Sequence, residues 1–205
     1  LVSAFLERTF YQVDKKFLFR FLQMHQQKEQ DFMSYAEVGM VLPILKVLMI
    51  KRLGELCESL KERQAYRSSV GETGALQSDQ VDQAAKDNLL MMNLFNSFKK
   101  VCRMEMAEVY DRVSFCEMAL RKEPSGMYDQ MYDQTKADYR AQVVRRARKA
   151  HLSEYAYVQG LVERSAQHGG HVGWELFPAK PWAGRARTYV VVVALFAVGL
   201  AGLLA

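Results

Sequence analysis

The apolar run Tyr189–Ala205, YVVVVALFAVGLAGLLA, contains no charged residue, no Asn, no Gln and no Pro. A helix that crosses the hydrocarbon core of a bilayer needs about 17–25 apolar residues, so the run has the length of a short span. It is still apolar at its last residue, which predicts a transmembrane helix that is cut short.

Basic residues stand directly before this run, in the predicted juxtamembrane link 178–188. Because basic residues close to a span tend to stay on the cytoplasmic side, residues 1–188 are predicted to lie in the cytoplasm. The link then meets anionic lipid headgroups, which makes the lipid bilayer an expected partner. The basic residues of the link are Lys180, Arg185 and Arg187.

The composition places residues 1–188 in the globular class, since half of the chain is hydrophobic and a quarter is charged. The net charge of +5 is mild, and no segment interleaves aromatic with basic residues as nucleic-acid modules do. Nucleic acid is therefore not an expected partner. The cysteines Cys57, Cys102 and Cys116 form no close pair, which favours reduced thiols over a disulfide frame or a zinc site.

Helical periodicity extends over most of the chain, and no strand period of useful length appears before the apolar run. The sequence therefore predicts an all-α, bundle-like domain followed by the truncated span. Asp14 and the Ser34/Glu37 capping box are expected to start helices. The expected helical stretches are 1–30, 34–67, 80–103, 105–122, 135–150 and 153–166.

The Ser- and Gly-rich stretch 68–79 predicts a linker between a first helical subdomain, 1–67, and a second one, 80–177. In the first, Pro43 lies inside a helical pattern and is expected to kink that helix. Residues 38–50 are apolar nearly all round, which predicts burial on several sides. The expected inner face of this helix comprises Leu42, Leu45, Leu48, Met49, Leu53, Leu56 and Leu60.

Three stretches, in order, resemble the region that precedes the first membrane spans of the bacterial cyclic β-1,2-glucan synthases. They are Glu37–Leu53, Leu120–Tyr128 with the following Thr135–Arg140, and His171–Gly173. The similarity departs from the family pattern at Trp174 and Glu175, which replace two aromatic residues. The structural motif residues that carry the resemblance are Pro43, Pro124, Gly126, Tyr128, His171 and Gly173.

The resemblance implies a large protein of the bacterial inner membrane that polymerises glucose from UDP-glucose. Its glucosyltransferase domain, with the carboxylates that hold a divalent metal against the diphosphate, is expected downstream of residue 205. This segment then has no catalytic, cofactor-binding or metal-binding residue of its own, and it scaffolds the downstream domain against the membrane.

A basic cluster lies in the expected helix 135–150 and consists of Arg140, Arg145, Arg146, Arg148 and Lys149. One interpretation is contact with anionic headgroups or with the nucleotide-sugar side of the enzyme. The other is a solvated helix face, which is what charge runs usually form.

Several polar residues admit both a chemical and a structural interpretation. Asp129, Asp133 and Asp138 are either paired acids or turn and cap residues, and Thr135 with Asp138 fits a helix start. His168 and His171 are either metal ligands or loop residues, and no third ligand stands near them. Tyr128, Tyr132 and Tyr139 are either sugar-accepting hydroxyls or packed aromatic residues.

Two other functions stay open. The first is a tail-anchored helical interaction module without enzymatic activity, with Tyr189–Ala205 as its anchor. The second is an enzyme in its own right, which the sequence favours least because it shows no nucleophile–base pair and no metal constellation.

Overall fold

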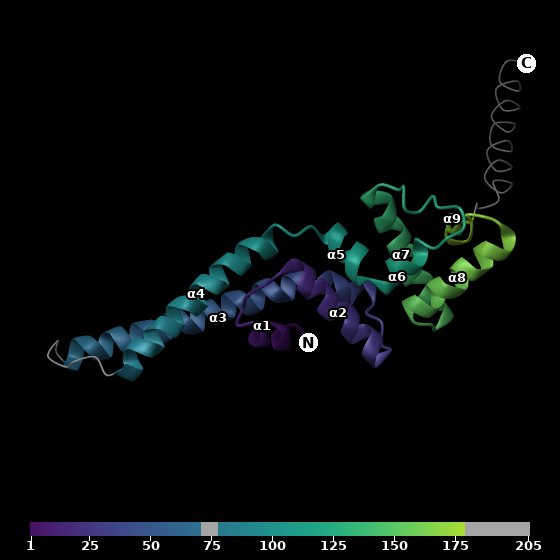
Figure 1. Cartoon of the computed structure of the whole chain (residues 1–205). Helices are drawn as coiled ribbons and strands as arrows, with labels where there is room; N and C mark the ends of the chain where they lie inside the picture. Colours follow the sequence, from purple (N-terminus) through teal and green to yellow (C-terminus); the bar gives the residue numbers. More distant parts are fainter. Residues whose placement is uncertain (71–77, 179–205) are drawn as a thin grey trace, which may run out of the picture.

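The computed structural model describes residues 1–70 and 78–178 (Figure 1). Over these ranges the regular secondary structure is helical, without a β-strand, which confirms the predicted all-α class. The helices are α1 (Val2–Arg8), α2 (Lys15–Glu29), α3 (Tyr35–Val70), α4 (Ser78–Cys102), α5 (Met106–Val113), α6 (Phe115–Leu120), α7 (Asp133–Ala150), α8 (Glu154–His168) and α9 (Val172–Leu176).

None of the helices in these two ranges is long and apolar enough to cross a membrane. The predicted span Tyr189–Ala205 lies outside the described residues, as does the predicted link after residue 178.

The helices α3 and α4 run side by side in opposite directions and form a long hairpin that projects from the rest of the molecule (Figure 1). The predicted linker 68–79 is helical at both ends, because α3 continues to Val70 and α4 begins at Ser78. Within this extension of α3, the Ser68 hydroxyl donates to the carbonyl oxygen of Gln64, 3.0 Å away, which gives the side chain a local partner inside the helix. Residues 71–77 lie outside the described part of the chain.

A first hydrophobic core is built by α1 to α5. Leu22 of α2 and Leu45 of α3 are fully buried there, together with Leu94 of α4 and Val109 of α5. The core therefore joins residues from both of the predicted subdomains, 1–67 and 80–177.

The inner face of α3 is buried where the helical period predicts, but the expected burial on several sides is wrong for the described chain. Because α1, α4 and α5 pack on one side of α3, its outer side faces solvent. Four large apolar residues on that side are between 39% and 64% exposed: Met40, Ile44, Val47 and Ile50.

Both N-caps predicted for the first half of the chain are confirmed. The Asp14 carboxylate accepts a hydrogen bond from Phe17 N, 2.9 Å away. At the start of α3, Ser34 Oγ accepts from Glu37 N (3.3 Å), and Glu37 Oε2 accepts from Ser34 N (2.8 Å). This reciprocal pair satisfies two backbone donors that the first helical turn leaves free.

Replacing Ser34 with alanine is expected to lower the free energy of unfolding by about 1 kcal/mol, because one N-terminal donor of α3 loses its acceptor. Urea unfolding followed by circular dichroism measures the change. Ser68→Ala, at the exposed far end of the same helix, is the matched control and should change stability by less than about 0.5 kcal/mol. Equal effects of the two substitutions would contradict the capping role.

The stretch 1–30, predicted as helical, is interrupted between α1 and α2. Phe10 and Tyr11 adopt left-handed backbone angles, with φ of 49° and 58°. Side chains of α4 hold this turn: Asn93 Nδ2 donates to Phe10 O (3.1 Å), and Ser97 Oγ accepts from Val13 N (2.8 Å). Contacts with a helix that is distant in sequence therefore override the local helical pattern.

The predicted helix 105–122 is divided into α5 and α6 at Ser114. This residue has extended backbone angles (φ −77°, ψ 118°), and its hydroxyl oxygen accepts a hydrogen bond from Glu117 N at 3.3 Å. Ser114 thus ends one helix and caps the next.

The helix starts predicted for the last third of the chain are half right. The structure starts α7 at Asp133 with Tyr132 as an N-cap without a side-chain bond, so the predicted opening by Thr135 and Asp138 is wrong. By contrast, Ser153 caps α8 as predicted, and its Oγ accepts from Ala156 N at 3.2 Å.

A second hydrophobic core lies among α6, α7, α8 and α9, with Tyr128 fully buried in it. The N-terminus of α3 joins the two cores. Tyr35 N donates to Glu154 Oε2 of α8 (2.7 Å), and Tyr110 of α5 donates its hydroxyl to Tyr35 O (3.3 Å).

Candidate functional site

The loop between α6 and α7 places the carboxylate of Glu123 inside the second core, beside the start of α9. Gly126 turns the chain with a left-handed φ of 63°, a conformation that glycine adopts without steric cost. Its N–H bonds to Glu123 O at 3.2 Å. This turn returns the backbone toward Glu123, so that Tyr128 N reaches the Glu123 side chain.

Four donors surround the Glu123 carboxylate. Oε1 accepts from Tyr128 N (2.6 Å) and from the Ser125 hydroxyl (2.8 Å). Oε2 accepts from Val172 N (3.1 Å) and contacts His171 Nδ1 (2.5 Å). Glu123 therefore ties its own loop to the first residues of α9.

His171 continues this network toward α7. Because an ionised carboxylate only accepts hydrogen bonds, the Nδ1 that faces Glu123 carries the proton. The other ring nitrogen, Nε2, lies 2.8 Å from the Tyr139 hydroxyl. Glu123, His171 and Tyr139 thus form a chain of hydrogen bonds that joins the loop, α9 and α7.

A second buried carboxylate, Glu117 of α6, extends the network. Its Oε2 accepts from the Tyr128 hydroxyl (2.9 Å), and its Oε1 pairs with Arg140 Nη1 (3.1 Å). The Arg140 guanidinium also lies 4.5 Å from the centre of the Tyr110 ring. Tyr128 donates to both buried carboxylates, one through its backbone and one through its hydroxyl. We call the following residues together the buried polar network: Glu117, Glu123, Ser125, Tyr128, Tyr139, Arg140 and His171.

Gly173 permits the close approach of α9 to α7. A Cβ atom at this position would overlap the Tyr139 hydroxyl oxygen and would lie 2.8 Å from His171 Cδ2. Real Cβ atoms do not come so close to other heavy atoms, so glycine is required for this packing.

The network unites residues that the sequence analysis named from two separate stretches. Pro124, Gly126 and Tyr128 belong to the loop, while His171 and Gly173 begin α9. Pro43, named with them, lies inside α3 and takes no part in the network. The kink predicted at Pro43 stays a prediction.

The ionisation states of the network favour a structural role over a reactive one. Burial raises the pKa of Glu123, but the bonds from Tyr128, Val172, Ser125 and His171 outweigh it, so the net pKa lies below the usual range. Burial and a neighbouring carboxylate raise the pKa of both Tyr128 and Tyr139. The phenols therefore stay protonated at neutral pH and act as donors, not as nucleophiles.

Stability is expected to fall as the pH drops below about 5, in part through Glu123. A carboxyl with a lowered folded-state pKa stabilises the fold above its unfolded pKa of about 4.3, and this contribution is lost as the pH falls through the folded value. Urea unfolding between pH 7 and pH 3.5 should show a steeper decline for the wild type than for Glu123→Gln. Parallel curves would show that Glu123 does not contribute.

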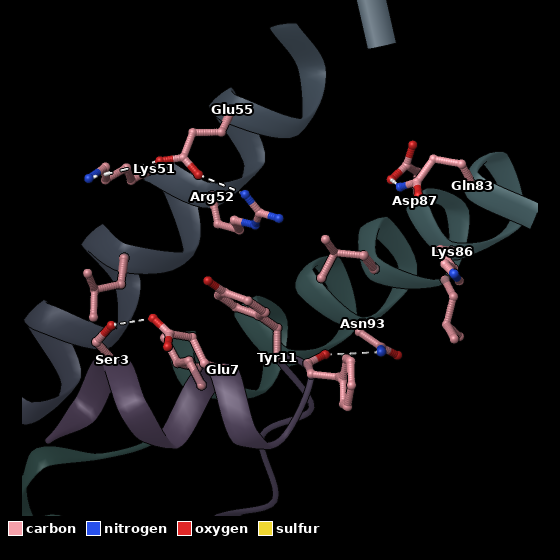
Figure 2. Close-up of a pocket in the computed structure, with 15 residues that line it drawn as sticks. Ser3, Glu7, Tyr11, Lys51, Arg52, Glu55, Gln83, Lys86, Asp87 and Asn93 are labelled. Carbon is pink, nitrogen blue, oxygen red and sulfur yellow. Dashed lines mark hydrogen bonds and ion pairs between the residues drawn. The ribbon is translucent and has the colours of Figure 1, made fainter. Parts of the chain in front are cut away.

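A cavity of about 650 Å³ lies between α1, α3 and α4, on the first core (Figure 2). Leu6, Leu48 and Leu90 are among its apolar walls. Three of its charged groups pair with one another, as Figure 2 shows for Glu55, which contacts Arg52 (2.9 Å) and Lys51 (3.9 Å). The sequence did not indicate this cavity, because its walls come from three separate helices.

The predicted basic cluster is only partly at the surface. Arg140 is not available for headgroup contact, because its guanidinium is committed to Glu117 and Tyr110. Arg145, Arg148 and Lys149 are exposed, and Arg146 is half-buried. Their role in membrane or enzyme contact stays a prediction, and Lys180, Arg185 and Arg187 lie outside the described residues.

The remaining acidic and histidine candidates lie in ion pairs or at helix ends. Asp129 pairs with Arg121 at 3.1 Å, and Asp133 begins α7. His168 ends α8 and is exposed. Within residues 1–70 and 78–178, no three His, Cys, Asp or Glu side chains form a group that could hold a metal ion.

Sequence reasoning missed the roles of Glu117 and Glu123. Glu117 lies beside the apolar core positions Val113, Cys116 and Leu120, and an acidic residue on an apolar helix face is a usable signal of a buried ion pair. Glu123 carried no such signal, since its position before proline is typical of an ordinary turn.

Comparison with known proteins adds no relative: no protein-family model, curated protein or solved structure matches this chain. The functional interpretation therefore depends on the geometry described above and on the sequence resemblance.

Proposed function

We propose that this chain is a non-catalytic helical scaffold. It is the amino-terminal cytoplasmic region of a membrane glucosyltransferase that resembles the cyclic β-1,2-glucan synthases and uses UDP-glucose. Residues 1–188 pack under the downstream catalytic domain, on the cytoplasmic side of a bacterial inner membrane. Tyr189–Ala205 enters the bilayer, and the metal-dependent chemistry belongs to the downstream domain.

The observation that carries this proposal is the buried polar network. Two of the three stretches that resemble the family, Leu120–Tyr128 and His171–Gly173, supply residues to it. It binds α9 to the helical body, and α9 is the last described helix before the basic link and the apolar run. A fully bonded polar network of this kind rigidifies its surroundings, which suits a part that orients a neighbouring domain.

Sequencing the gene beyond codon 205 tests the parent protein directly. A glucosyltransferase domain with acidic metal-binding motifs would support the proposal, and a stop codon directly after codon 205 would overturn it. The purified chain is also incubated with UDP-glucose and Mg²⁺ or Mn²⁺. We expect no release of UDP, and turnover by this chain alone would contradict a non-catalytic role.

The second candidate is a tail-anchored interaction module, and exposed apolar side chains favour it. Besides the outer side of α3, Leu89, Met92 and Phe95 of α4 are each more than half exposed. A groove of about 680 Å³ beside α3 is lined in part by Met33, Met40 and Ile44. This candidate requires function without a downstream domain, so the same sequencing result separates the two.

A further inference from the structure

Two aromatic side chains project from the end of the described chain. Trp174 is 79% exposed and Phe177 is 41% exposed. They stand three residues apart, which places them as neighbours on one side of a helical turn. Val172 and Leu176, on the other side of α9, are buried in the second core.

The buried polar network holds these aromatic residues in place. The Phe177 ring packs on the Tyr139 ring, with 5.0 Å between centroids. Trp174 N donates to His171 O (3.0 Å), and Phe177 N donates to Gly173 O (2.8 Å). Their exposure is therefore a property of a fixed short helix and not of a frayed end.

We call Trp174 and Phe177 the exit patch. The carboxylate next to the patch, Glu175, is neutralised by Arg164 at 2.8 Å, so no unpaired acid of α9 opposes a negatively charged surface.

We infer that the exit patch lies in the interfacial layer of an anionic lipid bilayer and fixes how the helical body sits on the membrane. This inference deepens the proposed function and rests on it, because it requires Tyr189–Ala205 to enter the bilayer. Pro178 and Tyr189 lie at most about 40 Å apart even when the chain between them is fully extended, which limits how far α9 can stand from the membrane surface.

The chemistry of the patch and of the following link fits this occupant. Tryptophan is enriched where hydrocarbon meets headgroups, because its ring is apolar and its N–H seeks a polar partner. Lys180, Arg185 and Arg187 follow in sequence and attract anionic headgroups. Arg148 and Lys149, at the C-terminal end of α7, lie about 15 Å along the helix from Tyr139, whose ring contacts Phe177 of the patch.

Tryptophan quenching by brominated lipid tests the inference. The chain has Trp174 and Trp182 as its tryptophans, so Trp182→Phe leaves Trp174 alone. The full chain is reconstituted into vesicles of phosphatidylcholine and phosphatidylglycerol, brominated either near the headgroup end or deep in the acyl chains. We expect loss of Trp174 fluorescence, larger with the shallow label than with the deep one.

Two control variants, both also carrying Trp174→Phe and Trp182→Phe, separate the possible failures. Phe95→Trp places the probe on exposed α4 and should not be quenched. Phe196→Trp places it in the apolar run and should be quenched more by the deep label. Quenching of Phe196→Trp without quenching of Trp174 would overturn the placement of the exit patch in the bilayer, also if the patch binds a protein partner instead. The membrane anchor would still stand. Absence of quenching for Phe196→Trp would overturn both the membrane anchor and the exit patch. Quenching of Phe95→Trp as strong as that of Trp174 would contradict a specific patch.

Discussion

Replacing Glu123 with alanine is expected to lower the free energy of unfolding by about 3–5 kcal/mol, because several buried hydrogen-bond donors lose their common acceptor. The substitution leaves Tyr128 N and Val172 N without their acceptor, and it leaves His171 without its carboxylate. An unsatisfied buried donor costs about 1–3 kcal/mol, so two or three together account for this effect.

Urea unfolding of the full chain measures this loss, with Glu175→Ala as the matched control. Glu175 is also an acidic residue in the same region, but its ion pair with Arg164 is half exposed to solvent. Exposed ion pairs contribute about 0–1 kcal/mol, so the control should be nearly neutral. A loss below about 1 kcal/mol for Glu123→Ala would show that the network does not stabilise the fold.

Replacing Gly173 with alanine is expected to cost about 3 kcal/mol, at the upper end for one added carbon in a packed core. The new Cβ must displace the Tyr139 hydroxyl and the His171 ring, and that movement also breaks the hydrogen bond between them. The residue types around this site do not indicate a clash, so only the contact geometry identifies alanine as harmful.

A control and a rescue variant test this explanation. Gly170→Ala, three residues earlier, meets no atom within 4 Å and should change stability by less than about 0.5 kcal/mol. Tyr139→Phe removes the oxygen that the new Cβ overlaps. The double variant Gly173→Ala with Tyr139→Phe should therefore be more stable than the sum of the two single losses implies. Strict additivity would contradict the proposed clash.

The parts of the fold that depend on local sequence were predictable. Asp14, Ser34 with Glu37, and Ser153 start helices as predicted, because an N-cap bonds to donors within three residues. The turn at Phe10 and Tyr11 was not predictable, since Asn93 and Ser97 hold it from more than eighty residues away. Likewise, periodicity shows which faces of α3 are apolar but not which of them another helix covers.

Some residues of the candidate site were predictable, but its two buried carboxylates and its contacts were not. The resemblance singled out Tyr128, His171 and Gly173 as motif positions without showing that they meet. Their meeting depends on how α7 and α8 fold back on each other, which brings residues 123 and 171 together. Arg140 shows the same limit. The basic run to which it belongs suggests a solvated surface, and only the packing shows that Arg140 faces inward and pairs with Glu117.

In the proposed scaffold, the buried polar network holds α9 rigidly against the helical body. Hydrogen exchange at the amide of Val172, which donates to Glu123, tests this most directly. We expect Val172 N–H to be protected as strongly as the interior amides of α8, and to lose that protection in Glu123→Ala. Exchange of Val172 at the rate of a frayed end, while α8 stays protected, would contradict the claim.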